Sequence, residues 1–139
     1  MQNSAARIVV DSKSRFGSTQ ILQQLHWLPV SHRIDYKIAL TVFKSFSTGQ
    51  PSYLRQMLSV SRPIRSLRSS DYTLHTVPLC KTAIADRAFS SYAPRLWNRL
   101  PQKLRDCVSE STTTCVSIDT FKRMLKSVLF TAAFGTVTV

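Results

Sequence analysis

The sequence predicts a small, mainly helical domain with a minor extended or β-hairpin segment. The chain has 139 residues, of which 43% are hydrophobic, so it can bury one compact core. Apolar residues recur at spacings of three and four along several segments, which is typical of amphipathic helices. The chain has only 3 Gly and 6 Pro and a mean hydropathy of −0.07, which excludes a low-complexity chain and a disordered basic tail.

Two helices are expected before Pro29. Residues 2–10 carry several apolar side chains and no breaker, which favours a short helix. Ser18 or Thr19 can cap a second helix, whose apolar residues keep helical spacing as far as Leu28. Pro29 should end that helix because proline lacks the backbone N–H that a helix interior needs.

The clearest amphipathic helix is expected over residues 31–48, with Ser31 as its N-cap. Projected at about 100° per residue, its apolar side chains form one broad face and its cations form a narrow stripe opposite. The apolar face consists of Ile34, Ile38, Ala39, Val42, Phe43 and Phe46, and the basic stripe consists of Arg33, Lys37 and Lys44. Gly49 can end this helix, and Pro51 fits the first turn of the next, through Leu58.

Helical spacing is lost over residues 62–87, where an extended or hairpin segment is expected at about residues 69–82. It returns over residues 88–98, although Pro94 must start, kink or break that helix. Pro101 can open a short helix through Cys107, and the Ser/Thr run at residues 109–114 favours a flexible link. Ser117 should cap a last helix whose apolar seam is Ile118, Phe121, Leu125 and Val128.

The charge predicts a polyanionic partner. Lys and Arg total 19 and Asp and Glu total 7, which gives a formal net charge of +12, and most of the excess lies in residues 50–106. Arg outnumbers Lys, which favours bidentate recognition of phosphate. The candidate nucleic-acid-binding residues are Arg33, Lys37, Lys44, Arg62, Arg65, Arg68, Arg87, Arg95, Arg99, Lys103 and Arg105.

Two clusters within this set have an alternative interpretation. Arg62, Arg65 and Arg68 recur every third residue after a proline-biased segment, so they could form a ladder along a nucleic-acid backbone or a solvated loop paired with Asp71. The cluster at residues 87–105 is interleaved with aromatic rings, which could stack on bases. The helical spacing of Phe89 and Trp97 favours a core position for both rings, and Trp27 is expected in the core too.

The sequence predicts no enzyme, metal site or cofactor. Its carboxylates are scattered singly, whereas two-metal phosphoryl transfer needs them clustered. Its 3 Cys include no C-x-x-C pair, and a Cys/His nucleophile near Cys80 is the weak alternative. The first residues do not form a signal peptide, so an intracellular location, cytoplasmic or nuclear, is expected, and no membrane contact.

Five phrases resemble, in this order, the region after the reverse transcriptase core in LINE-type (non-LTR) retrotransposon polyproteins. They are LHWLPVSHRIDYKIAL at residues 25–40, PSYL at 51–54, RSLRSS at 65–70, DRAFSSYAPRLWNRLP at 86–101 and FKRMLKSVLF at 121–130. The resemblance implies the end of a thumb-like region at residues 1–15, a C-terminal helical domain at 16–130 and a loose terminus at 131–139. Ala85, in place of a glycine, and an insertion at residues 110–116 depart from the family pattern.

The resemblance implies a role without catalysis, because the family's polymerase aspartates lie upstream and this chain has no adjacent pair of aspartates. The parent family is an RNA-directed DNA polymerase. The chain is expected to bind element RNA or target DNA through its Arg-rich surface, beside the upstream polymerase domain and with no small-molecule substrate. The alternatives are a packing module that docks on the polymerase thumb, or a relic open reading frame with no selected function.

Overall fold

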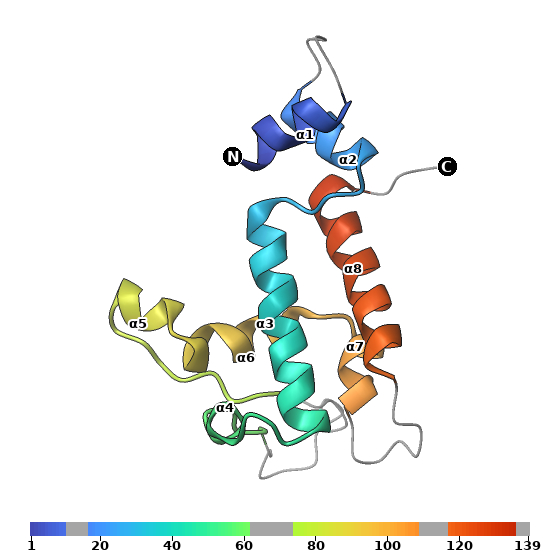
Figure 1. Cartoon of the computed structure of the whole chain (residues 1–139). Helices are drawn as coiled ribbons and strands as arrows, with labels where there is room; N and C mark the ends of the chain where they lie inside the picture. The colour runs from blue at the N-terminus through green and yellow to red at the C-terminus, as the bar shows by residue number, and fades with distance from the viewer. Residues whose placement is uncertain (11–16, 62–73, 109–116, 136–139) are drawn as a thin grey trace. The chain divides into compact units, whose positions relative to one another are not determined.

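The computed structural model describes residues 1–10, 17–61, 74–108 and 117–135, and helices dominate these ranges (Figure 1). The predicted mainly α class is therefore confirmed. The helices are α1 (Gln2–Val10), α2 (Ser18–Gln24), α3 (Val30–Ser47), α4 (Ser52–Gln56), α5 (Ala83–Arg87), α6 (Phe89–Arg99), α7 (Gln102–Arg105), the 3₁₀ turn η1 (Asp106–Val108) and α8 (Ile118–Phe134).

The chain forms two compact units. Unit 1 comprises Met1–Tyr36 and Met124–Val139, and unit 2 comprises Lys37–Arg123. The boundaries between them fall inside α3 and inside α8, so each of these long helices contributes residues to both units. The sequence-based division at residues 15 and 130 stays a prediction.

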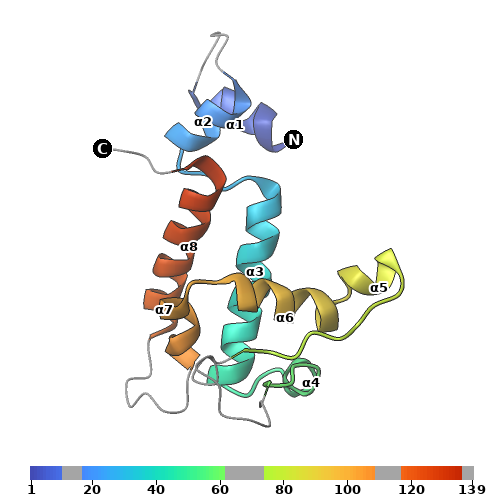
Figure 2. The same cartoon turned by 180° about the vertical axis from the view of Figure 1, so that it is seen from behind.

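Unit 1 is built on the contact between α1 and α2, which lie side by side in both views (Figures 1 and 2). Ala6, Ile21 and Leu22 form its buried cluster, on which Trp27 and Phe134 pack with part of their surface exposed. The Gln2 side-chain amide donates a hydrogen bond of 2.8 Å to the Leu28 carbonyl, which ties the first turn of α1 to the segment after α2. The predicted helix at residues 2–10 is confirmed.

The sequence predicted that Pro29 ends the second helix, but α2 already ends at Gln24. Its end is a Schellman arrangement, in which Trp27 N–H donates to the Leu22 carbonyl at 2.9 Å and His26 N–H donates to the Gln23 carbonyl at 3.1 Å. His26 takes the left-handed position, with φ 52°. A glycine or asparagine usually marks this position, so a histidine there gave no stop signal in the sequence.

The N-caps predicted for α2 and α3 are also wrong. Gly17 precedes α2 without a side-chain cap, so neither Ser18 nor Thr19 acts as one. The helix α3 begins at Val30, one residue before its expected cap, and the Ser31 hydroxyl lies 3.2 Å from His32 Nδ1 instead. Ser117 does cap α8 as predicted, since its hydroxyl accepts a hydrogen bond of 3.3 Å from Asp119 N–H.

Unit 2 has an aromatic core. Phe121 is fully buried, and its ring stacks on Phe43 with centroids 4.1 Å apart and on Trp97 with centroids 6.1 Å apart. The predicted core position of Trp97 is confirmed, because its side chain is 1% exposed. Phe89 is half-buried, as is Trp27 in unit 1.

The apolar face of α3 is narrower than the sequence predicted. Ala39, Val42 and Phe43 are buried, but Ile34 is 53% exposed. At about 100° per residue, Ile34 lies roughly 140° around the helix from Ala39, so a core centred on Ala39 and Phe43 leaves it outside.

The predicted seam of α8 is confirmed at Phe121 and Leu125, which are both fully buried.

The expected extended segment is present, but it pairs with a different part of the chain. Val60 and His75 form an antiparallel bridge, supported by hydrogen bonds of 2.8 Å from Ser61 N–H to the Leu74 carbonyl and from Thr76 N–H to the Ser59 carbonyl. Residues 69–73 of the predicted segment lie outside the described ranges. Within residues 74–80 the backbone is not helical, as predicted.

Further element boundaries differ from the sequence prediction. Residues 83–87 form the helix α5, because the Thr82 hydroxyl accepts a hydrogen bond of 3.2 Å from Ala85 N–H and caps it. Pro51 and Pro101 each precede a short helix instead of starting it, and α4 stops at Gln56. Pro94 lies inside α6, and α8 continues to Phe134, so residues 131–134 are helical. The predicted link at 109–114 lies outside the described residues.

Gly49 ends α3 as predicted, with a φ of +70° that L side chains rarely adopt. We expect Gly49→Ala to lower the free energy of unfolding by about 1 kcal/mol, because the added Cβ strains the left-handed backbone. Gly17→Ala is the matched control, since Gly17 has a φ of −61° and no atom within 4 Å of a new Cβ. Urea unfolding of both variants checks this, and an equal effect on both would contradict it.

Candidate functional site

The predicted basic stripe lies on α3 and faces solvent. Arg33, Lys37 and Lys44 are exposed, and they follow one another at helical spacing as the sequence predicted. The Thr41 hydroxyl donates back to the Lys37 carbonyl at 2.9 Å, and the Thr48 hydroxyl donates to the Lys44 carbonyl at 2.7 Å. Within the described ranges none of the three cations forms an ion pair, so their charge stays available to a ligand.

Two of the candidate cations lie at the junction of α6 and α7. Arg99 ends α6 and Lys103 lies in α7, and both are exposed and take part in no ion pair of the described residues. Arg105 is half-buried in the last turn of α7, and Arg87 is exposed at the end of α5. Arg62, Arg65 and Arg68 lie outside the described residues, so the ladder interpretation stays a prediction.

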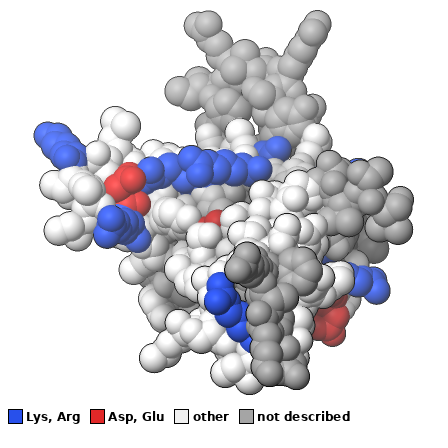
Figure 3. All heavy atoms as spheres, turned by 90° about the horizontal axis from the view of Figure 1, so that it is seen from above, with Lys and Arg blue, Asp and Glu red and all other residues white. Residues whose placement is uncertain are grey.

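Arg95 has a structural partner. Its guanidinium forms a two-pronged ion pair with the Asp86 carboxylate, including Nη1 to Oδ2 at 2.9 Å, and Nη2 also donates to the Asp86 carbonyl at 3.2 Å. The hydrogen bond from Arg95 lowers the pKa of the Asp86 carboxyl. This pair ties α5 to α6 and neutralises Arg95. On the face drawn in Figure 3, an acidic group lies directly against Lys and Arg atoms.

Arg55 is a cation that the sequence analysis did not single out. Its guanidinium carbon lies 4.0 Å from the centre of the Phe46 ring, and Nη1 donates to the Phe46 carbonyl at 3.3 Å. It therefore satisfies a carbonyl in the last turn of α3, where a positive charge is favourable. Its position nine residues after Phe46 follows no local spacing rule, so the sequence carries no signal for this contact.

His75 is buried in unit 2, where it is 4% exposed and stacks on Phe46 with ring centroids 4.8 Å apart. Its backbone N–H donates to Asn98 Oδ1 and its carbonyl accepts from Asn98 Nδ2, both at 2.9 Å. Burial lowers the pKa of His75 from 6.5 to about 4, against a hydrogen bond with the Ser59 backbone, which raises it. The imidazole is therefore neutral in the fold at pH 7.

We expect this burial to make the fold acid-sensitive. Because the folded pKa lies below the unfolded one, the stabilisation is complete above about pH 6.5 and is lost as the pH falls toward about 4. Between about pH 7 and pH 5 the free energy of unfolding should fall by about 2 kcal/mol through His75. Urea unfolding at the two pH values measures it, and His75→Phe should remove this part of the pH dependence. An equal pH dependence in both proteins would contradict the assignment.

Two cysteines of the described residues, Cys80 and Cys107, are free thiols. No group of three His, Cys, Asp or Glu side chains lies close enough within them to hold a metal ion. The Cys80 thiol lies 2.7 Å from the Ser91 hydroxyl, and its other partners are backbone carbonyls rather than a histidine. Burial raises the pKa of the Cys107 thiol, which keeps it protonated at pH 7.

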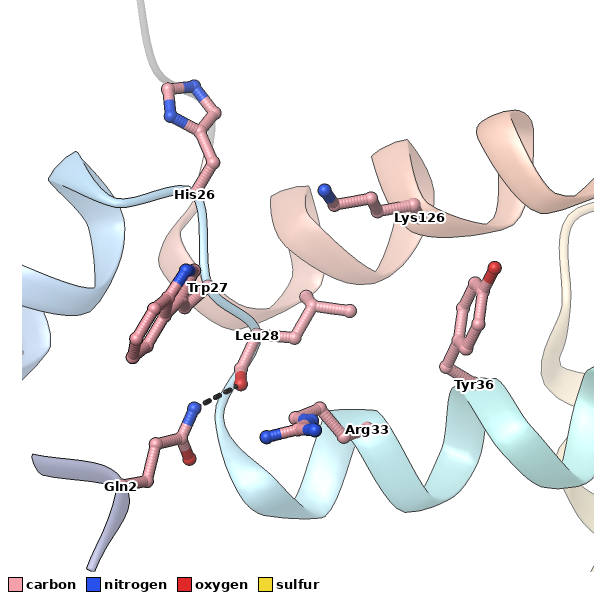
Figure 4. Close-up of a pocket in the computed structure, with 7 residues that line it drawn as sticks. All are labelled: Gln2, His26, Trp27, Leu28, Arg33, Tyr36 and Lys126. Atoms are coloured by element: carbon pink, nitrogen blue, oxygen red, sulfur yellow. Dashed lines mark hydrogen bonds between the residues drawn. The ribbon is translucent and has the colours of Figure 1, made fainter. Parts of the chain in front are cut away.

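Unit 1 contains a pocket with a volume of about 520 Å³ that the sequence analysis did not predict. Its walls come from α1, from the segment between α2 and α3, from the first turns of α3 and from α8 (Figure 4). The lining residues are Gln2, His26, Trp27, Leu28, Arg33, Tyr36 and Lys126. Arg33 is the one predicted candidate among them.

We compared the chain with protein-family models, curated proteins and solved structures. None gives a significant match. Across the ranges that the structure describes, every helix is too short or too polar to cross a lipid bilayer.

Proposed function

We propose that the chain is a non-catalytic C-terminal fragment of a LINE-type reverse transcriptase polyprotein, and that it binds RNA or DNA through exposed cations of unit 2. The observation that carries the proposal is the state of Lys37, Lys44, Arg99 and Lys103. All four are exposed and none enters an ion pair within the described residues, in a chain of net charge +12. We call these four residues the basic set.

The chemistry of the basic set suits a phosphate backbone. Lys37 and Lys44 are two turns apart on one face of α3, a separation of roughly 10 Å along the axis. Successive phosphates of one strand of a duplex lie about 3.4 Å apart along the axis, so each cation can engage its own phosphate. Each contact releases a condensed counterion, which favours binding without any reading of base sequence.

The test is a comparison of two oligomers with the same bases. We expect the purified chain to bind a labelled single-stranded RNA at low salt and to ignore an analogue whose backbone carries no charge. Fluorescence anisotropy measures both titrations. Equal binding of the two oligomers, or no detectable affinity for the RNA, would rule out recognition of the phosphate backbone.

A docking function is the second candidate, because unit 2 exposes apolar side chains. Leu79 is 101% exposed and Ile84, on the short helix α5, is 85% exposed. Exposed apolar side chains of this size are stabilised when a partner covers them. They therefore support the interpretation that the chain packs against an upstream polymerase domain. The test is the binding of an apolar dye to the original chain and to a double variant, Leu79→Ser with Ile84→Ser. Strong binding by the original chain that the double variant loses would favour the docking function. A chain that neither binds RNA nor exposes such a patch would favour a relic.

A further inference from the structure

The pocket of unit 1 combines cations with aromatic and amide groups. Arg33 projects from α3 and Lys126 from α8, and the Leu28 side chain lies between these helices in Figure 4. The Tyr36 hydroxyl and the Gln2 amide add groups that can donate hydrogen bonds. Among the described residues, no carboxylate lines the pocket, so its polar side chains favour a negatively charged ligand.

The two cations of the pocket are free to bind such a ligand. Arg33 and Lys126 are both exposed, and neither forms an ion pair with any described residue. A guanidinium can hold two oxygens of a phosphate at once, and an ammonium can bind a phosphate as a point charge. The volume of about 520 Å³ lies within the range of ordinary small-ligand pockets.

The aromatic wall of the pocket is held by a strained backbone. His26 keeps a φ of 52°, and its ring stacks on Phe130 with centroids 5.4 Å apart. A left-handed histidine costs about 1 kcal/mol, and such strain is often found where a binding site is formed. The turn at His26 places Trp27 in the pocket wall, and Trp27 as a whole is half-buried. An indole in a pocket wall can stack on a nucleobase.

We propose that this pocket binds one nucleotide unit, which the charges of Arg33 and Lys126 attract and whose base lies against Trp27. This inference rests on the proposed function for the class of ligand, but it uses a different site from the basic set. The nucleotide can come from a free mononucleotide or from a single strand. The two sources share the same chemistry, a phosphate linked to an aromatic base, and the experiment separates them.

The measurement is tryptophan fluorescence. The chain has 2 Trp, so Trp97→Phe leaves Trp27 as the sole indole reporter. Trp97 Nε1 has no hydrogen-bond partner among the described residues, so the change to Phe removes no such bond. We expect uridine monophosphate to quench Trp27 saturably at low salt. Uridine should bind more weakly, and inorganic phosphate should compete without quenching.

Charge variants locate the site. Arg33→Gln with Lys126→Gln should weaken binding of uridine monophosphate at least roughly tenfold, because each change removes a charge-assisted contact. Lys81→Gln with Arg87→Gln removes the same charge from exposed positions of unit 2 that lie outside the basic set, and it should leave that binding unchanged. Circular dichroism checks that each variant keeps its helices.

The possible outcomes distinguish a free nucleotide from a nucleotide within a strand. Quenching by a short oligouridylate and not by the mononucleotide would assign the pocket to a nucleotide within a strand, whereas equal quenching by both would show that a free nucleotide suffices. No quenching by either ligand, or equal weakening by the two pairs of variants, would overturn the proposal. RNA binding that the basic set controls would survive that result, so failure of the pocket and failure of the proposed function can be told apart.

Discussion

Replacing Phe121 with Ala should lower the free energy of unfolding by about 3–5 kcal/mol, the largest effect on stability that we expect from a single change. The ring is fully buried between Phe43 and Trp97, with centroids 4.1 Å and 6.1 Å away. Truncation removes its apolar contacts and leaves a cavity that rigid aromatic neighbours cannot fill.

Urea unfolding followed by near-ultraviolet circular dichroism measures this loss directly in the aromatic core. Tyr53→Ala is the matched control, because Tyr53 is 60% exposed and should cost less than about 1 kcal/mol. If the two variants unfold at the same urea concentration, Phe121 does not occupy the centre of unit 2.

The sequence predicted those elements whose signals are local. Ser117 precedes the apolar seam of α8 and caps it, and Gly49 ends α3 with a positive φ. The end of α2 could not be predicted, since His26 occupies a position that usually takes glycine. The helix α5 was missed because its Thr82 cap stands among residues without helical spacing. Ile34 was misplaced because periodicity gives the apolar face but not the neighbour that covers it.

The candidate binding residues were likewise predictable only where their signal is local. The stripe on α3 follows from helical spacing alone, so Arg33, Lys37 and Lys44 were found. The pairing of Arg95 with Asp86 joins side chains nine residues apart on two helices, which no local pattern indicates. The pocket brings Gln2 and Lys126 together from distant parts of the chain, so only the folded structure could reveal it.

Neutralising the basic set should weaken RNA binding on the order of 100-fold at low salt, because each exposed cation–phosphate contact contributes up to about 1 kcal/mol. The variant carries Lys37→Gln, Lys44→Gln, Arg99→Gln and Lys103→Gln. All four side chains are exposed, so the fold should be retained. Fluorescence anisotropy with labelled single-stranded RNA measures the loss.

The control for this variant keeps the charge at the same positions. It carries Lys37→Arg, Lys44→Arg, Arg99→Lys and Lys103→Arg, and it should bind within a few-fold of the original chain. If the charge-retaining protein loses affinity as severely as the neutral one, side-chain shape rather than phosphate attraction governs binding, and the proposed mechanism is wrong.

The dependence of RNA affinity on salt tests the central claim most directly. A plot of log affinity against log salt concentration should slope downward, and its slope should be steeper for the original chain than for the neutral variant by about 3, as expected for four contacts with a single strand. Parallel plots for the two proteins, or an affinity that salt leaves unchanged, would contradict binding through the basic set.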